Sequence, residues 1–420
     1  MKKRVVITGI GPATALGIGK DEMFKNLLNM KTCISRIPMR YEKSYHFKSR
    51  FFVPGPEFSL KEHDIPQNCE NIMEEISRLS VICAKLALED AGFSIKFKNG
   101  NCQADCPKDC MTIIGVGMSS LQTAMNSHTA HISECNNSNK YRYNRMVIPM
   151  LMPNSASSWI TILFGIKGYN YTVNASCASG SMAIGEAYNN IMQGRCDTVI
   201  TGGVEALSEE SGSIMRGFDM LTVLTKSRDG LPLPFSRDRS GFLFNQGAGC
   251  VLILEELQKA KKRGARIYAE ISGYECSGDA YHIVQMEPSG KRIEELFKKL
   301  VKEIKIDYLN AHGTATISND EIEAKIIQNI FGNRSNQPYI NSTKGLLGHS
   351  IGASGAIEAA VTALSIKKSV IHGNLTTNPI EDLNLPLLST EASIKYGLSA
   401  SYGFGGHNVL LLLKRFDKDE

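Results

Sequence analysis

Three short motifs of small residues carry the side chains of this chain that are best suited to chemistry. Cys177 lies in the run Asn-Ala-Ser-Cys-Ala-Ser-Gly, and His312 and His349 each lie in a glycine-containing turn further along the chain. A thiolate attacks acyl groups, and an imidazole moves protons or donates a hydrogen bond to a developing oxyanion. One thiol and two imidazoles in such settings indicate covalent acyl transfer.

Cys177 lies just before a segment, Ser181–Met192, whose pattern predicts a helix. A helix N-terminus carries partial positive charge and free backbone amides, both of which stabilise a thiolate. We therefore expect the pKa of this thiol to fall below its usual value of about 8.5. The alternative is a buried structural cysteine, which is the commonest state of a free cysteine; the other ten cysteines lack this setting.

The two histidines lie at turns beside predicted regular elements. His312 follows a predicted strand, Tyr308–Asn310, and His349 precedes a predicted helix, Ala356–Ile366. Turns at strand ends are where α/β folds place reactive groups. Either histidine alone is more often structural, but two such histidines with a candidate nucleophile favour a shared site. The remaining histidines lack such surroundings: His46, His63, His128, His131, His282 and His372.

Four further residues lie near these motifs. Lys344 is in a Gly/Ser/Thr turn before His349, and Asp320 and Glu323 open the helix predicted after His312. Carboxylates in a first turn commonly serve the helix dipole; the functional alternative is that they orient Lys344 and His349. Phe404 lies among three glycines in a predicted tight turn, whose backbone amides either stabilise an oxyanion or belong to an ordinary β-turn.

Composition describes an ordinary globular protein. The chain has 420 residues, of which 42% are apolar and 21% charged, with a net charge of +5. No apolar stretch approaches the ~18 residues that span a bilayer, and basic and aromatic residues do not interleave as a nucleic-acid surface requires. The weak basic bias suits an acidic protein partner. The first residues read as a strand and the eleven cysteines as reduced thiols, so we expect a cytoplasmic location.

Apolar strand patterns alternate with helical patterns along the chain, which predicts an α/β fold with buried sheets. The predicted strands are Val5–Ile7, Thr112–Val116, Thr198–Thr201, Cys250–Leu254, Ala269–Gly273, Tyr308–Asn310, Tyr339–Asn341 and Val409–Leu413. The predicted helices are Ile76–Ala91, Ser181–Met192, Arg292–Glu303, Asp320–Ile330 and Ala356–Ile366.

A weak internal repeat is visible. A small-residue helix start at Cys177 and another at Ile351 are each followed, some tens of residues later, by a glycine turn and an aliphatic strand. The repeat predicts two copies of one layered unit, residues 1–257 and 258–420. Chance similarity between Gly/Ala-rich turns is the alternative.

Two other patterns do not support a cofactor site. The Gly9–Thr14 segment lacks the third glycine of a dinucleotide-binding loop and contains a proline. The polar segment Lys98–Cys110 carries Cys102, Cys106 and Cys110 at a spacing that matches no common zinc or iron–sulfur pattern. We interpret these three cysteines as structural.

Taken in order, the motifs resemble those of the β-ketoacyl-acyl-carrier-protein synthases, the elongating condensing enzymes of the thiolase-like superfamily. The resemblance extends from Val5 to Asn408 and includes the segments Leu86–Gly92, Arg237–Phe242 and Lys261–Glu270. It implies a five-layered αβαβα sandwich with internal duplication, which is usually dimeric. It also implies substrates carried on the phosphopantetheine arm of acyl carrier protein, with no cofactor and no metal.

The resemblance implies a role for each motif residue. Cys177 would take the acyl chain, while His312 and His349 would assist decarboxylation of a malonyl thioester and stabilise the enolate. The backbone amides of Cys177 and Phe404 would form the oxyanion hole, with the Phe404 ring as a gate.

Supporting roles follow in the same way. Lys344 would hold the charge and geometry of the site, with Glu323 and Asp320 as its partners. Thr314 and Thr316 would contact the pantetheine arm. Met118 and Phe218 are expected to line the acyl pocket, although a core methionine beside a strand is an equally good interpretation of Met118.

The histidines favour the decarboxylating, elongating branch, because thiolases use a second cysteine and initiating synthases typically place asparagine at position 349. Three departures distinguish the chain from fatty-acid members: an acidic stretch at Cys69–Glu75 in place of basic docking residues, a short helix at Arg292–Glu303, and Asn319 where glycine is usual. We therefore favour the ketosynthase subunit of a type II polyketide system, paired with itself or with a homologous chain-length factor. The alternatives are fatty-acid elongation and a non-catalytic chain-length-factor-like partner, which the presence of Cys177 disfavours.

Overall fold

An eleven-stranded sheet runs through the computed structural model, which describes residues 3–43, 45–98, 101–118, 121–136, 142–302, 304–380 and 382–417. The strand order is β8-β7-β9-β11-β1-β12-β18-β17-β13-β14, with the short β2 (Gly17–Ile18) paired to β1. The strands on the β8 side are β1 (Val5–Thr14), β7 (Met111–Gly115), β8 (Asn170–Val173), β9 (Thr198–Ala206) and β11 (Gly247–Glu256). Those on the β14 side are β12 (Ala269–Gly278), β13 (Tyr308–Asn310), β14 (Tyr339–Asn341), β17 (Tyr396–Gly403) and β18 (His407–Lys414).

The two sets of five strands have the same topology. In each set, numbered along the chain, the spatial order is third, second, fourth, fifth, first. The second strand is parallel to the third and fourth in both sets, and the remaining pairs are antiparallel. The sets meet where β1 pairs with β12, with Val5 opposite Ile271. The duplication predicted from the weak sequence repeat is thereby confirmed.

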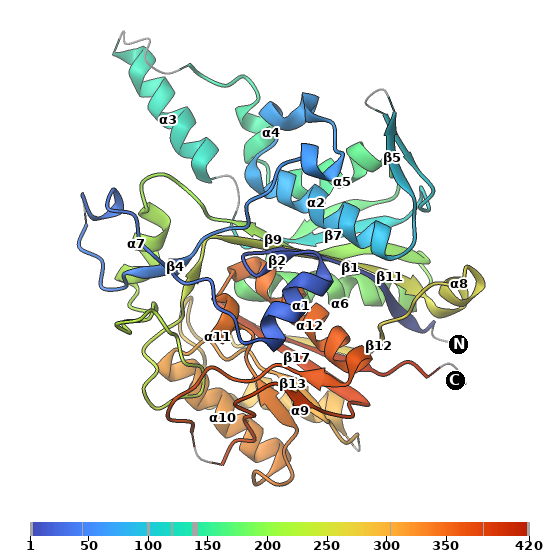
Figure 1. Cartoon of the computed structure of the whole chain (residues 1–420), viewed down its shortest axis with the longest axis vertical. Coiled ribbons are helices and arrows are strands. Elements are labelled where there is room, and N and C mark those ends of the chain that lie inside the picture. The colour runs from blue at the N-terminus through green and yellow to red at the C-terminus, as the bar shows by residue number, and fades with distance from the viewer. Residues whose placement is uncertain are drawn as a thin grey trace.

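Helices divide the structure into five layers, as Figure 1 shows from top to bottom. Two helices cover the outer face of the first strand set, two fill the centre, and two cover the outer face of the second set. These pairs are α2 (Glu75–Asp90) with α5 (Ser155–Phe164), α6 (Ser179–Met192) with α12 (Ser354–Lys368), and α9 (Lys291–Val301) with α10 (Ile317–Phe331). The predicted αβαβα sandwich is confirmed.

The central helices α6 and α12 approach each other at glycines. A Cβ on Gly180 would lie 2.8 Å from the nitrogen of Ala356, and a Cβ on Gly355 would lie 2.3 Å from the hydroxyl of Ser181. Every residue of α12 from Ser354 to Ile366 is buried, as expected of a helix enclosed on all sides. The close crossing brings the N-termini of both helices to one region of the molecule.

All predicted strands and helices are present, but β1, β9 and β12 extend five to seven residues beyond their predicted ends. The predicted helix Arg292–Glu303 ends at Val301, and Glu303 lies outside the described residues. Sequence reasoning missed β8 and β17, because the first reads as polar and the second is interrupted by glycine and serine.

Several shorter elements complete the fold. The remaining helices are α1 (Lys20–Leu28), α3 (Leu121–Cys135), α4 (Val147–Leu151), α7 (Ser213–Met220), α8 (Leu257–Lys262) and α11 (Lys344–Leu347). The small sheets are β3 (Ser35–Arg36), β4 (Phe51–Val53) and β10 (Phe244–Asn245); β5 (Ile95–Lys98) and β6 (Asn101–Ala104); and β15 (Val370–Ile371) and β16 (Thr390–Glu391). No helix among the described residues is both long and apolar enough to cross a bilayer.

The cysteine-bearing segment Lys98–Cys110 begins at the last residue of β5 and contains β6, which pairs with β5; Asn99 and Gly100 lie outside the described residues. Cys106 and Cys110 are buried and Cys102 packs beside them, in the apolar cluster that surrounds α2 and α5. Within the described part of the chain, no three His, Cys, Asp or Glu side chains are grouped to hold a metal ion.

Candidate active site

A strained turn holds Cys177 at the start of α6. Ser176 has a φ of +54°, a left-handed conformation that non-glycine residues rarely adopt. The hydroxyl of Ser179 accepts a hydrogen bond from the nitrogen of Ala175 at 2.9 Å, which fastens the two ends of the turn. A Cβ on Gly403 would lie 2.6 Å from the oxygen of Ala175, so glycine is needed where the end of β17 approaches the turn.

Burial raises the pKa of the Cys177 thiol to about 11. Lys344 and the backbone amides of Phe404 and Cys177 lower the pKa, but by less than burial raises it. The expectation of a pKa below the usual value is therefore wrong, because the helix-terminus argument ignored the loss of water around the sulfur. At neutral pH the resting side chain is a thiol.

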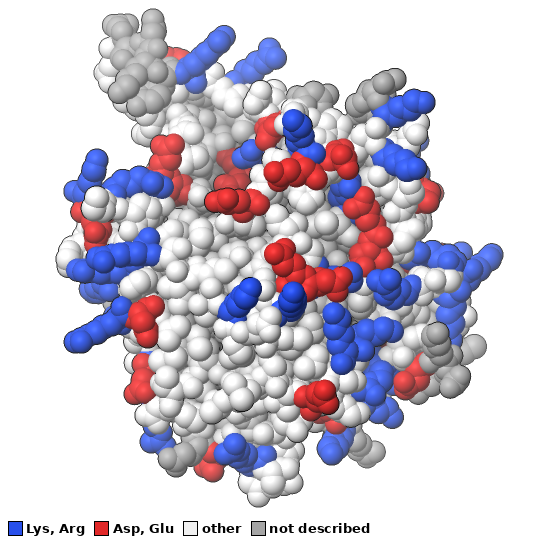
Figure 2. Space-filling view, in the orientation of Figure 1, with Lys and Arg blue, Asp and Glu red and all other residues white. Residues whose placement is uncertain are grey.

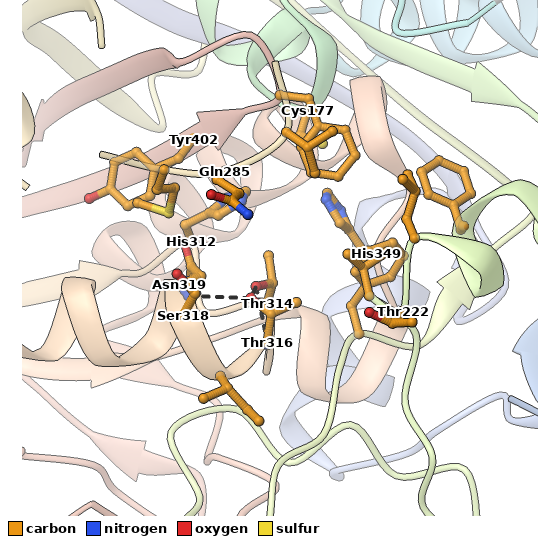
Figure 3. Close-up of a pocket in the computed structure, with 18 of the residues that line it drawn as sticks. Cys177, Thr222, Gln285, His312, Thr314, Thr316, Ser318, Asn319, His349 and Tyr402 are labelled. Atoms are coloured by element: carbon orange, nitrogen blue, oxygen red, sulfur yellow. Dashed lines mark hydrogen bonds between the residues drawn. The ribbon is translucent and has the colours of Figure 1, made fainter. Parts of the chain in front are cut away.

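One cavity of about 450 Å³ unites the predicted chemical residues. Cys177, His312 and His349 all line it, and Figure 3 shows the two histidines on opposite sides of the space below Cys177. Cys177 is 5% exposed, and its side chain lines this cavity. Further lining residues include Phe218, Thr314, Thr316, Asn319, Tyr402 and Phe404.

His312 is held by a buried ion pair behind it. The ammonium of Lys344 lies 3.3 Å from Nδ1 of His312 and also donates to Glu358 on α12. Because an ammonium only donates, Nδ1 accepts and the ring proton belongs on Nε2. Burial raises the pKa of Glu358 to about 7, although Lys344 opposes that shift.

The structure corrects the predicted partners of Lys344. Glu323 accepts hydrogen bonds from the backbone amides of His312, at 2.9 Å, and Gly313, at 2.8 Å. Burial raises the pKa of Glu323 to about 7. Glu323 therefore fixes the backbone that carries His312, while the ion-pair partner of Lys344 is Glu358 on the other helix.

Asp320 likewise supports backbone. Its oxygens accept hydrogen bonds from the backbone amides of Phe235, at 2.7 Å, and Ala315, at 3.1 Å. Both of these residues have a positive φ. Burial raises the pKa of Asp320, and these amides oppose the shift. Asp320 is thus not a partner of Lys344, because it stabilises two strained turns. Its neighbour Asn319 lines the cavity, and the amide of Asn319 donates a hydrogen bond to Asp320 at 3.0 Å.

His349 faces His312 across the cavity, with ring centroids 5.7 Å apart and planes at 88°. Its Nδ1 is 2.9 Å from the hydroxyl of Ser354, and its ring packs edge-on against Phe242 at 5.0 Å. Burial, followed by the charge of Lys344, holds the pKa of both imidazoles well below the usual value of about 6.5. Both rings are therefore neutral at physiological pH.

The predicted substrate-binding residues divide into two groups. Thr314 and Thr316 line the cavity with their hydroxyls 2.9 Å apart, and Phe218 lines it from α7. Met118 does not line this cavity; it packs in the same apolar cluster as Cys177 and Phe218. Phe404 belongs to both the cluster and the cavity wall.

Sequence reasoning missed two buried carboxylates, Glu358 and Glu205. Glu205, at the end of β9, accepts three hydrogen bonds from backbone amides. The donors are Gly117 at 3.0 Å, Met118 at 2.9 Å and Gly352 at 2.9 Å. Burial raises the pKa of Glu205 to about 8, and these amides lower it. The sequence did contain a signal for both residues, because each is a lone glutamate inside an otherwise apolar segment. The apolar patterns of strands and helices do not explain a charged residue at these positions.

A duplicated five-layered fold with one cysteine and two histidines in a shared cavity defines a thiolase-like condensing enzyme. Two family models match: the β-ketoacyl synthase N-terminal domain over residues 2–260 and the C-terminal domain over residues 268–378. The chain belongs to the β-ketoacyl synthase family and is an acyltransferase that catalyses ketosynthase condensation.

Relatives cover the whole chain. It is 34% identical over 430 residues to a 3-oxoacyl-[acyl-carrier-protein] synthase 2 of Staphylococcus aureus, with 99% of each chain covered. Two solved structures match with a TM-score of 0.84 and 25% identity, each covering 99% of this chain and 100% of the other. One is a type II polyketide ketosynthase bound to the hexaketide and in complex with its acyl-carrier protein, and the other is the ishigamide ketosynthase/chain length factor.

Proposed function

We propose that this enzyme joins a Cys177-bound acyl or polyketide chain to malonyl-acyl carrier protein in type II polyketide synthesis. The observation that carries the reaction is the single cavity shared by Cys177, His312 and His349. Residues 1–257 supply the cysteine and residues 258–420 supply both histidines, so each half of the duplicated chain contributes to one site.

In the first half-reaction, the sulfur of Cys177 attacks an acyl thioester. Its proton passes to a neutral imidazole, the carbon–sulfur bond to pantetheine breaks, and the departing thiolate is reprotonated. The amides of Phe404 and Cys177, which already lower the pKa of the thiol, are placed to stabilise the oxyanion that forms. Because the resting thiol is protonated, proton removal accompanies attack.

In the second half-reaction, malonyl loses carbon dioxide and its electron pair moves into an enolate. The ammonium of Lys344 occupies Nδ1 of His312 and so keeps the ring proton on Nε2. His312 donates a hydrogen bond from this Nε2–H to the enolate oxygen, and His349 donates a second one. The enolate carbon then attacks the acyl-Cys177 carbonyl, the carbon–sulfur bond to Cys177 breaks, and the departing thiolate takes up a proton from water to restore the resting thiol. Decarboxylation supplies the carbanion equivalent, so the steps call for no organic cofactor or metal.

The remaining lining residues have positioning roles in this scheme. Thr314 and Thr316 present adjacent hydroxyls to the pantetheine arm. The Phe404 ring, at the boundary between cavity and apolar cluster, gates the two half-reactions. Phe218 bounds the acyl chain, with Met118 behind it in the same cluster.

Asn319 supports the polyketide assignment. Its amide lines the cavity and donates to both Asp320 at 3.0 Å and Glu323 at 3.3 Å, interactions that a glycine at this position lacks. The acidic stretch Cys69–Glu75 points the same way.

Fatty-acid elongation is the second candidate. It is favoured by the 34% identity over the full chain to a 3-oxoacyl-[acyl-carrier-protein] synthase 2. The two candidates share every chemical step and differ in primer, product length and partner.

The proposed partners are acyl carrier protein and a second ketosynthase-fold subunit, in the cytoplasm. Among the residues that the structure describes, β8 ends the large sheet and no strand pairs with its outer edge. Nearby α4 and α5 expose Ile148 (65%) and Ile162 (65%), and Tyr169 before β8 is 72% exposed. An open edge bordered by large apolar side chains suits pairing with an identical chain or a homologous chain-length factor.

Two experiments test the proposal. Incubation with an acyl thioester should yield acyl-Cys177 by intact mass, and addition of malonyl-loaded carrier protein should then yield carbon dioxide and a β-ketoacyl product. Co-expression with the neighbouring genes should then yield a polyketide. A stable homodimer that makes only fatty acyl chains would contradict the pathway, and absence of any β-ketoacyl product would contradict the reaction.

A further inference from the structure

One buried carboxyl group is held by both halves of the chain. Glu205 lies one residue before the end of β9 and is 0% exposed. Its Oε1 accepts a hydrogen bond from the backbone amide of Met118, and its Oε2 accepts hydrogen bonds from the amides of Gly117 and Gly352. Gly117 belongs to residues 1–257 and Gly352 to residues 258–420, so one oxygen atom joins the two halves.

No described cation balances this carboxyl group. The charged side chains visible in Figure 2 lie at the surface. Buried Glu358 is paired with Lys344, whereas none of the cations that the structure describes lies within ion-pair distance of Glu205. Burial of a carboxyl group without a cation is unfavourable, and it raises the pKa of Glu205 to about 8. This cost indicates a role other than stability.

The first-half contacts of this carboxyl group lead to the acyl pocket and to the nucleophile. Met118 packs in the same apolar cluster as Cys177. The side chain of Asn174 donates a hydrogen bond to the carbonyl of Gly117 at 2.9 Å. It also accepts one from the nitrogen of Ser176, directly before the nucleophile, at 3.2 Å. The segment at Gly117 and Met118 is therefore linked both to the apolar cluster and to the turn that carries Cys177.

The second-half contact leads to the imidazole of His349. Gly352 directly follows Ile351, which lines the cavity, packs in the same apolar cluster and has a φ of +46°. His349 lies three residues before Gly352. Both belong to one short turn, which is closed by the hydrogen bond from the nitrogen of Ser350 to the hydroxyl of Ser354. A shift of the Gly352 amide therefore moves the backbone that carries the imidazole.

The two segments touch around the carboxyl group. A Cβ on Gly117 would lie 2.4 Å from Oε2 of Glu205, and a Cβ on Gly352 would lie 2.3 Å from the nitrogen of Gly117. Close-packed protein interiors transmit strain because they contain few voids into which atoms can move. A displacement of one segment is therefore passed to the other rather than absorbed between them.

We propose that Glu205 is a positioning residue that couples the acyl pocket to His349, so that malonyl loses carbon dioxide faster once Cys177 carries an acyl chain. The chain displaces the apolar cluster that contains Met118, and Glu205 passes this displacement to the turn that carries His349. The inference rests on the proposed function, because it concerns the order of the two half-reactions. Malonyl is then conserved until an acyl chain is in place to receive it.

The test compares Glu205→Gln with Glu255→Gln, both in the full chain. Glutamine keeps the size of the side chain but has one acceptor oxygen and an NH2 group that only donates, so at least one of the three amides loses its acceptor. Glu255 is the matched control, because it is also a buried carboxyl group of the large sheet. It lies opposite Thr198 at the other end of β9, where it pairs with Arg263.

The measurement is the rate of carbon dioxide release from malonyl-loaded acyl carrier protein in a single turnover. It is made with Cys177 free and again after Cys177 has been loaded from an acyl-coenzyme A, with the loading checked by intact mass. For the unaltered enzyme and for Glu255→Gln we expect acylation to raise the rate about tenfold. For Glu205→Gln we expect Cys177 to be acylated as before but the rate to change by less than about twofold.

A second variant decides the question if Glu205→Gln does not fold. Met118→Ala keeps the backbone amide that donates to Glu205 but removes the side chain on which the acyl chain acts, so it should also reduce the stimulation. The coupling is overturned if either folded variant is stimulated as strongly as the unaltered enzyme, or if Glu255→Gln loses the stimulation equally. It is also overturned if acylation does not stimulate the unaltered enzyme. Failure of the unaltered enzyme to form any β-ketoacyl product overturns the proposed function itself.

Discussion

The turns that begin α6 and α12 are built alike, one in each half of the molecule. Both contain a short 3₁₀ segment opened by a non-glycine residue of positive φ, Ser176 at +54° and Ile351 at +46°. In both, a serine hydroxyl three residues later accepts the backbone amide four residues before it: Ser179 from Ala175, and Ser354 from Ser350.

The turns differ at the residue after the strained position. That residue is Cys177 in the first turn and Gly352 in the second, where the amide donates to Glu205 from the other half. The second turn contributes His349 instead, three residues before Gly352. Similar backbone turns thus hold the proposed nucleophile, Cys177, in one half and the imidazole of His349 in the other, and the contrast predicts that acyl transfer and decarboxylation are separable.

The largest expected effect comes from the first turn. Cys177→Ala should lower condensation by about four to six orders of magnitude, because the acyl-enzyme cannot form. Decarboxylation of malonyl-carrier protein should continue, since both histidines remain. Product and carbon dioxide measured in the same reaction check this. Equal loss of both activities would show that the halves do not act separately.

The converse substitution removes a histidine. His312→Ala should lower decarboxylation about 10²–10³-fold, through loss of one donor to the enolate oxygen. Transfer of an acyl group to Cys177 should persist and be visible as a mass increase on the intact protein. A variant that no longer acylates Cys177 would place His312 in the first half-reaction as well.

Restoring a side chain to the second turn should cost stability. A Cβ on Gly352 would lie 2.3 Å from the nitrogen of Gly117 and 2.7 Å from Glu205. Gly352→Ala should therefore lower the free energy of unfolding by about 1–3 kcal/mol. Gly217→Ala, where a Cβ meets nothing within 4 Å, is the control and should leave stability unchanged or slightly raised. Equal denaturation midpoints for the two variants would contradict the crowding.

The smallest effect concerns the resting thiol. With the pKa of Cys177 raised to about 11, its thiolate fraction should grow about tenfold per pH unit from pH 7 to 10. Site-resolved alkylation by iodoacetamide should follow that slope, with labelling of the exposed Cys276 reporting reagent activity. A rate already level at pH 8 would mean that the turn stabilises thiolate despite burial.

Local patterns predicted an α/β fold with buried sheets and pointed to Cys177, His312 and His349 as candidate site residues, whereas the five-layered sandwich followed from the resemblance to the condensing enzymes. The Cys177 and His349 motifs stand out because small residues crowd around a single reactive one, and helix starts have a recognisable composition. The strands were found because buried strands read as continuous aliphatic runs.

The contacts behind the reactive groups were not predictable in this way. Glu358 meets Lys344, and Glu205 meets Gly352, only because the two halves pack together. The sequence placed Asp320 and Glu323 at the start of the helix after His312, but it did not reveal that their carboxylate oxygens would accept hydrogen bonds from backbone amides. The pKa of Cys177 was misjudged because burial depends on the whole cavity rather than on its own helix.

The ladder between β1 and β12 makes the molecule mechanically continuous. Val5, Val6 and Ile7 pair with Ile271, Glu270 and Ala269, so the halves share backbone hydrogen bonds rather than a flexible hinge. A rigid-body movement of one half away from the other would break these backbone hydrogen bonds. We therefore expect side chains and loops at the entrance of the cavity to control substrate entry and product release. Either half expressed alone would expose the unpaired edge of β1 or β12. We expect the whole chain to unfold on heating in one cooperative transition despite its length.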